Sequence, residues 1–167
     1  MTIEELNNLS DQEAFEELFK CCGSTRWANQ VNAEKPFESE SALIDLADKV
    51  WASCKGSDYK EAFTHHPKIG DIESLSKKFA STAKWASGEQ KNVESASKTT
   101  ITRLAELNET YASKFGFIFI VCATGKSADE MLQLLEERIG NNQVEELEIA
   151  AAEQHKITII RLRKLLS

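Results

Sequence analysis

The fold class is decided by residues Ser87 to Gly116, which read SGEQKNVESASKTTITRLAELNETYASKFG. Apolar or small side chains recur there every three or four residues, as on one face of an α-helix. Ser87 and Gln90 are spaced as a capping box, and Gly116 is typical of a helix end. The pattern predicts one helix of about seven turns. Its inner face would carry Val93, Ala96, Thr100, Leu104, Leu107, Tyr111 and Phe115.

Helix signals also dominate the sequence on both sides of this stretch. Three further capping boxes pair Thr2 with Glu5, Ser10 with Glu13 and Ser127 with Glu130. Ala14, Phe15, Leu18 and Phe19 follow Ser10 at helical spacing. We expect further helices from Ser24 to near Pro36, from Ser39 to Cys54, from Ser57 to Pro67, from Ile72 to Ala80, from Ser127 to Gly140 and from Asn142 to Leu166.

One segment has a different character. Residues 117–123 are rich in β-branched and aromatic side chains, which favours a buried, extended segment. A single strand cannot form a sheet, so this segment does not change the fold class. With few Gly and Pro and no repeats, we expect an all-α, single-domain, multi-helix bundle over residues 1–167, with one short extended segment near 117–123.

Bulk composition restricts the classes of partner. The chain has 167 residues, 41% of them hydrophobic, and a formal net charge of -7. Nucleic acids and anionic membranes select basic surfaces, so neither is an expected partner. A small anionic substrate stays possible because a few local cations suffice to bind it.

The four cysteines and the N-terminal sequence bear on location. Cys21, Cys22, Cys54 and Cys122 include no CxxC pair and no zinc-site spacing, so we expect buried, reduced thiols. The N-terminal residues do not resemble a signal peptide, and the longest apolar run is too short to span a bilayer. We therefore expect a soluble, cytoplasmic protein.

The sequence around His66 is the first candidate for chemistry. An imidazole titrates near neutral pH, and Pro67 restricts the backbone of the residue before it. His66 could act as a positioned acid or base, or could simply pack at a helix end. His65 and His66 lack the partners of a metal site, so no metal is expected.

Two charged residues complete a candidate set. Glu89 lies in the first turn of the long predicted helix, where the helix N-terminus stabilises a carboxylate. The simpler interpretation is that Glu89 only caps the N-terminus of this helix. The predicted inner face of the last helix carries Leu147, Ala151, Gln154, Thr158, Arg161 and Leu165. A guanidinium on that face must reach water, form an ion pair or bind an anion. Together with His66, this set suits proton transfer on a small anionic substrate.

Several short segments, in one order along nearly the whole chain, carry a resemblance to a known family. They are Cys21–Ala28, Phe63–Asp71, Ser87–Gln90, Leu107–Tyr111, Lys114–Phe119 and Ile157–Leu162. In these segments the chain resembles the 2-oxo-4-hydroxy-4-carboxy-5-ureidoimidazoline (OHCU) decarboxylases of urate breakdown. Ile118 departs from the pattern, since many members have Pro at this position.

The resemblance implies a fold, a reaction and a site. Members are all-helical, cofactor-free and commonly homodimeric, and they convert OHCU to (S)-allantoin and CO2. By matching position, His66 and Glu89 would be catalytic and Arg161 would bind the substrate. Pro67, Ser87, Gln90 and the backbone of Phe119, Ile120, Val121, Cys122 and Ala123 would line the pocket. Urate oxidase and hydroxyisourate hydrolase would be the pathway neighbours.

Two alternatives stay open at the level of sequence. The chain could be an enzyme of the same fold that acts on a related ureido or imidazoline acid, because ring selectivity depends on the shape of the pocket. It could instead be an inactive helical interaction module. In that second case His66, Glu89 and Arg161 would not converge in space.

Overall fold

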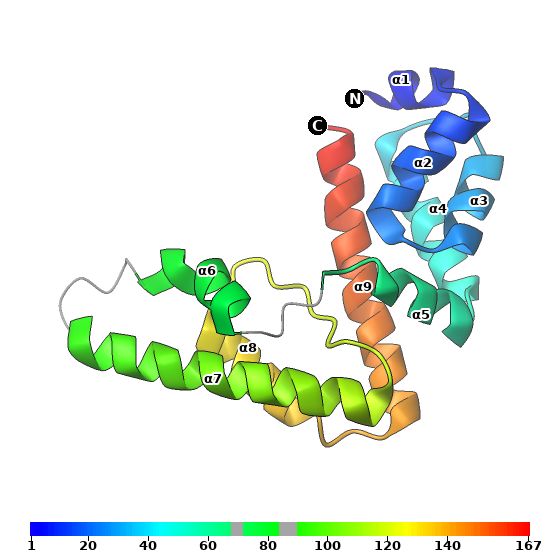
Figure 1. The fold of residues 1–167 in the computed structure, drawn as a ribbon. Coiled ribbons are helices and arrows are strands. Elements are labelled where there is room, and N and C mark those ends of the chain that lie inside the picture. The colour runs from blue at the N-terminus through cyan, green and yellow to red at the C-terminus, as the bar shows by residue number, and fades with distance from the viewer. Residues whose placement is uncertain (68–71, 84–89) are drawn as a thin grey trace. The chain divides into compact units, whose positions relative to one another are not determined.

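A computed structural model describes residues 1–67, 72–83 and 90–167, apart from the side chains of residues 78, 80–83 and 90–97. These described residues form nine α-helices and no strand, which confirms the predicted all-α class (Figure 1). The helices are α1 (Ile3–Asn8), α2 (Asp11–Cys22), α3 (Thr25–Ala33), α4 (Glu40–Ser53), α5 (Gly56–Thr64), α6 (Ile72–Ala83), α7 (Gln90–Phe115), α8 (Ala128–Arg138) and α9 (Gln143–Leu165).

The chain divides into two compact units. Unit 1 contains Met1–His66, Ile120–Cys122 and Leu147–Ser167, and unit 2 contains Pro67–Phe119 and Ala123–Glu146. Each unit is therefore assembled from segments that are distant in sequence. The expectation that residues 1–167 form one domain stays a prediction.

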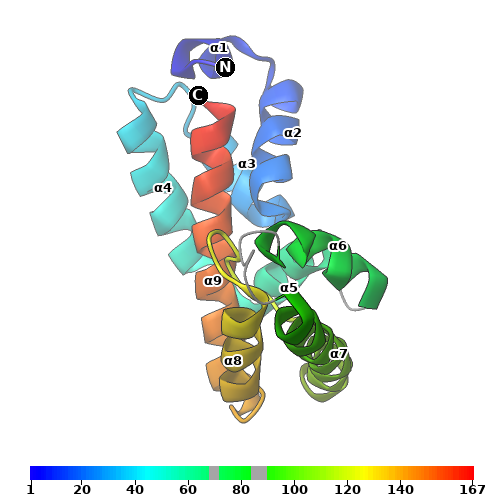
Figure 2. The same cartoon turned by 90° about the vertical axis from the view of Figure 1, so that its left-hand side faces the viewer.

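Two tryptophans tie together the helices of unit 1. The indole of Trp27 in α3 donates to the carbonyl of Ala47 in α4, at 3.2 Å. The indole of Trp51 in α4 donates to the carbonyl of Ala151 in α9, at 3.0 Å. Figure 2 shows the C-terminal half of α9 between α4 and α2. Both indole rings are buried and hydrogen-bonded, as large polar aromatics in a core require.

Unit 2 is organised around α7, which packs against α6 and α8. On its predicted inner face, Thr100, Leu104, Leu107, Tyr111 and Phe115 are buried, as expected. At the far end of the helix, the Glu146 carboxylate is fully buried. It accepts from Arg138 Nε at 2.7 Å, from the Tyr111 hydroxyl at 2.5 Å and from Asn141 Nδ2 at 3.0 Å. A buried carboxylate needs such partners, so this cluster is part of the internal structure of unit 2.

Local capping signals predicted several helix starts correctly. The reciprocal bonds of a capping box are present at Thr2 and Glu5, at Ser10 and Glu13, and at Ser127 and Glu130. The predicted box of Ser87 and Gln90 lies outside the described residues. The predicted helix start at Ser57 was one residue late, because Asp58 accepts from the Lys55 backbone N–H at 2.8 Å and α5 begins at Gly56.

Two other helix ends differ from expectation. Helix α6 extends to Ala83 rather than Ala80, since the intervening residues include neither Gly nor Pro to stop it. Helix α3 ends at Ala33, before the expected end near Pro36.

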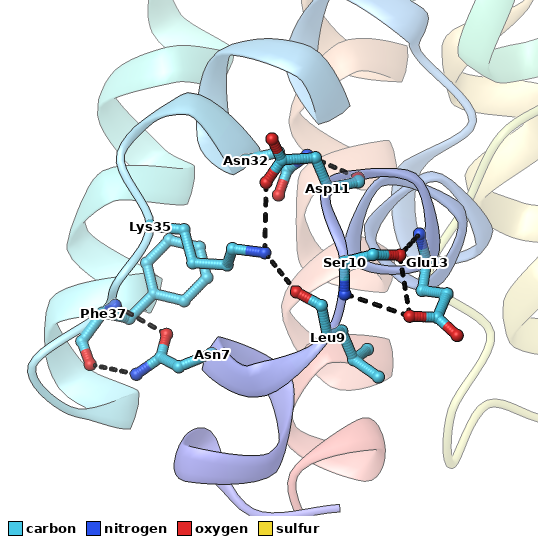
Figure 3. Close-up of polar contacts among 8 residues, drawn as sticks. All are labelled: Asn7, Leu9, Ser10, Asp11, Glu13, Asn32, Lys35 and Phe37. Atoms are coloured by element: carbon cyan, nitrogen blue, oxygen red, sulfur yellow. Dashed lines mark hydrogen bonds and ion pairs between the residues drawn. The ribbon is translucent and has the colours of Figure 1, made fainter.

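Side chains hold the segment after α3 against the junction of α1 and α2 (Figure 3). Lys35 Nζ donates to the carbonyl of Leu9 at 2.6 Å, and the Asn32 amide donates to the carbonyl of Asp11 at 2.8 Å. The Asn7 amide exchanges two hydrogen bonds with the backbone of Phe37, at 2.7 and 2.8 Å. Through these long-range hydrogen bonds, the residues after α3 bond to α1 and to the junction of α1 and α2 instead of continuing the helix.

The segment 117–123 lies outside the helices, as expected. Phe117, Ile120 and Cys122 are buried and the residues between them are half-buried, so the segment is an internal one. All four cysteines are free and buried, which confirms their predicted packing role. Among the described residues, none of the helices combines the length and apolar character needed to cross a membrane.

Candidate active site

The side chains of the candidate site bond to the C-terminal end of α2. The last carbonyls of a helix have no partner within it, and the helix dipole places partial negative charge there. Gly23 ends α2 with a φ of 82°, a left-handed conformation that glycine adopts without steric cost. The carbonyls of Cys21 and Cys22 are thereby presented to side chains from α9.

Gln154 of α9 binds one of these carbonyls. Its Nε2 donates to the carbonyl of Cys22 at 3.3 Å and to Thr158 Oγ1 at 3.2 Å. Gln154 and Thr158 are both fully buried, on the predicted inner face of α9. The other end of the Gln154 amide, Oε1, lies 2.5 Å from Nε2 of His66.

Arg161 binds the neighbouring carbonyl. Its Nη1 donates to the carbonyl of Cys21 at 3.4 Å, and the side chain is half-buried. Within the described part of the chain, no carboxylate pairs with Arg161. The structural ion pair considered from the sequence is therefore not observed there, and most of the guanidinium donors keep their capacity to bind an anion.

The two adjacent histidines have different environments. His65 follows α5 as its C-cap, and its ring meets Phe19 edge-on at 4.8 Å between centroids. It also covers Gly23 so closely that a Cβ added there would lie 2.9 Å from the His65 Cβ. His66 is half-buried and contacts Gln154 instead. His65 therefore packs on α2, whereas His66 contacts α9.

Burial is the main influence on the protonation of His66. It lowers the pKa of the imidazole, and the positive charge of Arg161 acts in the same direction. The hydrogen bond with Gln154 acts in the opposite direction and only partly offsets burial. His66 is therefore neutral at neutral pH, with Arg161 near enough to influence its charge.

The structure places the other predicted site residues in separate segments. Ser87 and Glu89 lie outside the described residues. Gln90 is the first residue of α7, and Pro67 is exposed directly after His66. Of the predicted set, the described structure thus brings together His66 and Arg161, both in unit 1.

The backbone segment 119–123 is divided between the units. In unit 2 the Phe119 ring packs on Tyr111 and beneath the Arg138 guanidinium, 4.5 Å from the ring centroid. In unit 1 the backbone N–H of Cys122 donates to the Glu153 carboxylate at 3.1 Å. Ile120 is buried and Val121 half-buried, while the carbonyl of Ala123 accepts from the Lys126 N–H at 3.1 Å in a turn.

Sequence reasoning missed the role of Gln154. The residue was visible on the inner face of α9, but a buried amide has no motif of its own. The available signal was its spacing, one turn before Thr158 and two turns before Arg161. No group of three or more His, Cys, Asp or Glu that could hold a metal ion occurs among the described residues.

Comparison with known proteins identifies similar sequences over nearly the full chain. A family model described as OHCU decarboxylase matches residues 7–163. The uric acid degradation bifunctional protein TTL of Arabidopsis thaliana is 40% identical over 147 residues, covering 88% of this chain and 45% of the relative. The chain thus spans less than half the length of that relative. The 2-oxo-4-hydroxy-4-carboxy-5-ureidoimidazoline decarboxylase of Haloferax volcanii is 26% identical, covering 100% of this chain and 97% of the relative.

Solved structures agree with the fold. A crystal structure of an OHCU decarboxylase in the presence of (S)-allantoin superimposes with a TM-score of 0.72 at 38% identity, covering 90% of this chain and 97% of the other. An (S)-allantoin synthase superimposes with a TM-score of 0.69 at 18% identity, covering 98% of this chain and 54% of the other. At that identity the second match is evidence for the fold alone.

Proposed function

The chain belongs to the OHCU decarboxylase family, and we propose that it is a carboxy-lyase that converts OHCU to (S)-allantoin and CO2 in urate breakdown. The observation that carries the proposal is the placement of His66 and Arg161 at the C-terminal end of α2. An inactive interaction module would have no need of a half-buried guanidinium beside a desolvated imidazole, since both are costly to bury.

The proposed roles follow from the chemistry of each group. Arg161 binds the anionic substrate through the guanidinium donors that Cys21 leaves available. When CO2 leaves, the electron pair of the broken carbon–carbon bond moves into the adjacent imine, so the substrate itself provides the electron sink. His66 moves the proton whose delivery to one face fixes the (S) configuration. We propose that Glu89 is a second catalytic group, which engages the ureido or hydroxyl group of the substrate and so helps to keep His66 in the useful protonation state. Pro67, Ser87, Gln90 and the backbone of residues 119–123 are proposed as substrate contacts.

A coupled assay tests this function. Urate is supplied with urate oxidase and hydroxyisourate hydrolase, and the circular dichroism of allantoin is followed with and without the chain. We expect faster formation of (S)-allantoin with the wild type. Racemic allantoin at the uncatalysed rate would refute the proposal.

Two variants separate the proposed roles. His66→Ala should lower kcat by about 100-fold or more, the range of general acid–base catalysis, and should lose stereochemical excess. Arg161→Ala should mainly raise KM. His155→Gln is the matched control, because His155 pairs with Asp48 on another face of α9 and should leave both constants unchanged. Full rate and stereochemical excess in His66→Ala would contradict the assignment.

The partners and location are proposed on the family relationship. We propose a homodimer that works in the cytoplasm after urate oxidase and hydroxyisourate hydrolase. The exposed Ile149 and Ile160, which share one face of α9, are candidates for an interface in such a dimer. Light scattering during gel filtration measures the mass directly, and a monomer at micromolar concentration would contradict this part.

A further inference from the structure

The contacts of the Gln154 amide determine which way it points. Thr158 gives its hydroxyl proton to the Gln154 main-chain carbonyl at 3.1 Å, so the Thr158 oxygen is left to accept. The carbonyl of Cys22 can only accept. Both groups therefore require N–H donors, and they use both hydrogens of the Gln154 amide nitrogen. A flipped amide would put its oxygen against these acceptors, so the orientation follows from the partners.

This orientation determines the tautomer of His66. Gln154 presents Oε1 to His66 Nε2 at 2.5 Å, and an amide oxygen has no hydrogen to donate. The hydrogen between them must therefore belong to Nε2. A neutral imidazole has one N–H, so Nδ1 then carries a lone pair. Among the described residues, no group forms a hydrogen bond with Nδ1.

We propose that Gln154 is a positioning residue that keeps the proton of neutral His66 on Nε2 and leaves Nδ1 to exchange the proton with the substrate. This inference rests on the proposed function and deepens it, because it assigns the working atom of His66. Arg161 and His65 are the charged or titratable described groups whose charges act on this ring, and both disfavour a second proton on it.

The proposed decarboxylation needs no oxidant or reductant, and every proton that moves has a source and a destination. CO2 leaves from the ring carbon that also bears the hydroxyl, and the bonding pair forms a double bond to the neighbouring carbon. The π pair of the imine moves onto its nitrogen, which takes one proton from water, and the hydroxide left behind combines with CO2 to give bicarbonate. Nδ1 then removes the hydroxyl proton, which creates the product carbonyl, and returns it to the carbon that bears the ureido group. Neutral His66 with Nε2–H is regenerated.

The ring nitrogens can be observed directly in the full chain. Nitrogen-15 NMR of protein labelled at histidine reports which nitrogen carries the proton, and His66→Gln identifies the His66 signals. In the wild type at neutral pH we expect a protonated Nε2, an unprotonated Nδ1 and a slowly exchanging Nε2 proton. A proton on Nδ1 instead of Nε2 would overturn the inference.

Two substitutions at Gln154 test the positioning role. Gln154→Leu removes the acceptor, so the slowly exchanging proton should disappear and kcat should fall at least about tenfold, a part of the about 100-fold or larger effect of acid–base catalysis. KM should stay within about twofold, because Arg161 is untouched. Gln154→Glu restores an acceptor for Nε2 and adds negative charge, so the acid limb of its pH profile should move upward by about one unit or more. Its kcat should recover only in part, because its second oxygen faces the carbonyl of Cys22 without a hydrogen to donate. His155→Gln, one residue further along α9, is the control for both measurements.

The two Gln154 variants can each refute the positioning role, and the wild-type assay tests the proposed function separately. Unchanged kcat in a folded Gln154→Leu protein would refute the positioning role. If Gln154→Leu does not fold, an unchanged pH profile in Gln154→Glu refutes it instead. If the wild type forms no (S)-allantoin while the nitrogen spectra match expectation, the proposed function fails and the assignment of the Nε2 proton stands.

Discussion

At the scale of single residues, the burial of His66 links protonation to stability. Because burial lowers the pKa of His66, the unfolded chain binds a proton more readily than the native one. The native state should therefore lose stability as pH falls below the ordinary value of about 6.5. The loss from this group is at most about 1.4 kcal/mol per pH unit.

Urea unfolding at pH 7.5 and 5.5 measures this effect. The wild type should lose more free energy of unfolding between the two pH values than His66→Gln does. His65 and His155 are present in both proteins, so their contributions cancel. An equal loss in the two proteins would show that the pKa of His66 is the same in the native and unfolded states.

Gly23 packs closely against His65, in the turn that also carries His66. Gly23→Ala should destabilise the native state by at least about 1–2 kcal/mol, because an L-residue is strained at a φ of 82°. The added methyl group also meets the His65 Cβ. Thermal unfolding measures the loss, and kcat should fall as well because the turn carries His66. Gly140→Ala is the control, since its Cβ would meet only ordinary contacts.

Single residues also mark the limit of prediction for the site. His66 and Arg161 were identified because an imidazole before Pro67 and a cation on an apolar helix face are unusual in the sequence itself. The importance of Gln154 depends on Cys22, more than a hundred residues away, whose carbonyl becomes available only because α2 ends there. A contact of that kind is set by tertiary packing, which no local pattern records.

At the scale of elements, capping chemistry is both predictable and testable. Ser10 Oγ accepts from the Glu13 backbone N–H at 3.3 Å, and Glu13 returns a bond to the Ser10 N–H at 3.0 Å (Figure 3). Ser10→Ala should lower the free energy of unfolding by about 1 kcal/mol. Ser57→Ala is the matched control because Ser57 is exposed within α5, and it should change stability by less than about 0.5 kcal/mol. Urea titration distinguishes the two, and equal effects would remove the cap as the cause.

Helix starts were predictable because a cap and the helix it opens are neighbours in sequence. Helix ends were less so when distant groups intervened, as Asn7 and Leu9 do for the segment after α3. Apolar periodicity identified the buried face of α7, since the 3.6-residue repeat is a property of the element alone. The division of α9 between two units, by contrast, has no periodic signal.

At the scale of the whole molecule, the cysteines report on the unfolding of unit 1, which contains all four. Burial raises the pKa of Cys22 to about 12 and that of Cys21 and Cys54 to about 11, so the thiolates of these three residues are scarce in the native state. Cys122 is buried as well, which limits its access to a reagent. Native protein should therefore react slowly with a thiol reagent, and protein in urea should react at all four sites.

Leu18→Ala, a fully buried site in α2, should destabilise unit 1 by about 2–5 kcal/mol and speed native labelling by about 30-fold or more. Ser57→Ala should leave the rate unchanged. If Leu18→Ala also leaves it unchanged, the reagent reaches the thiols through local openings that do not expose the core of unit 1.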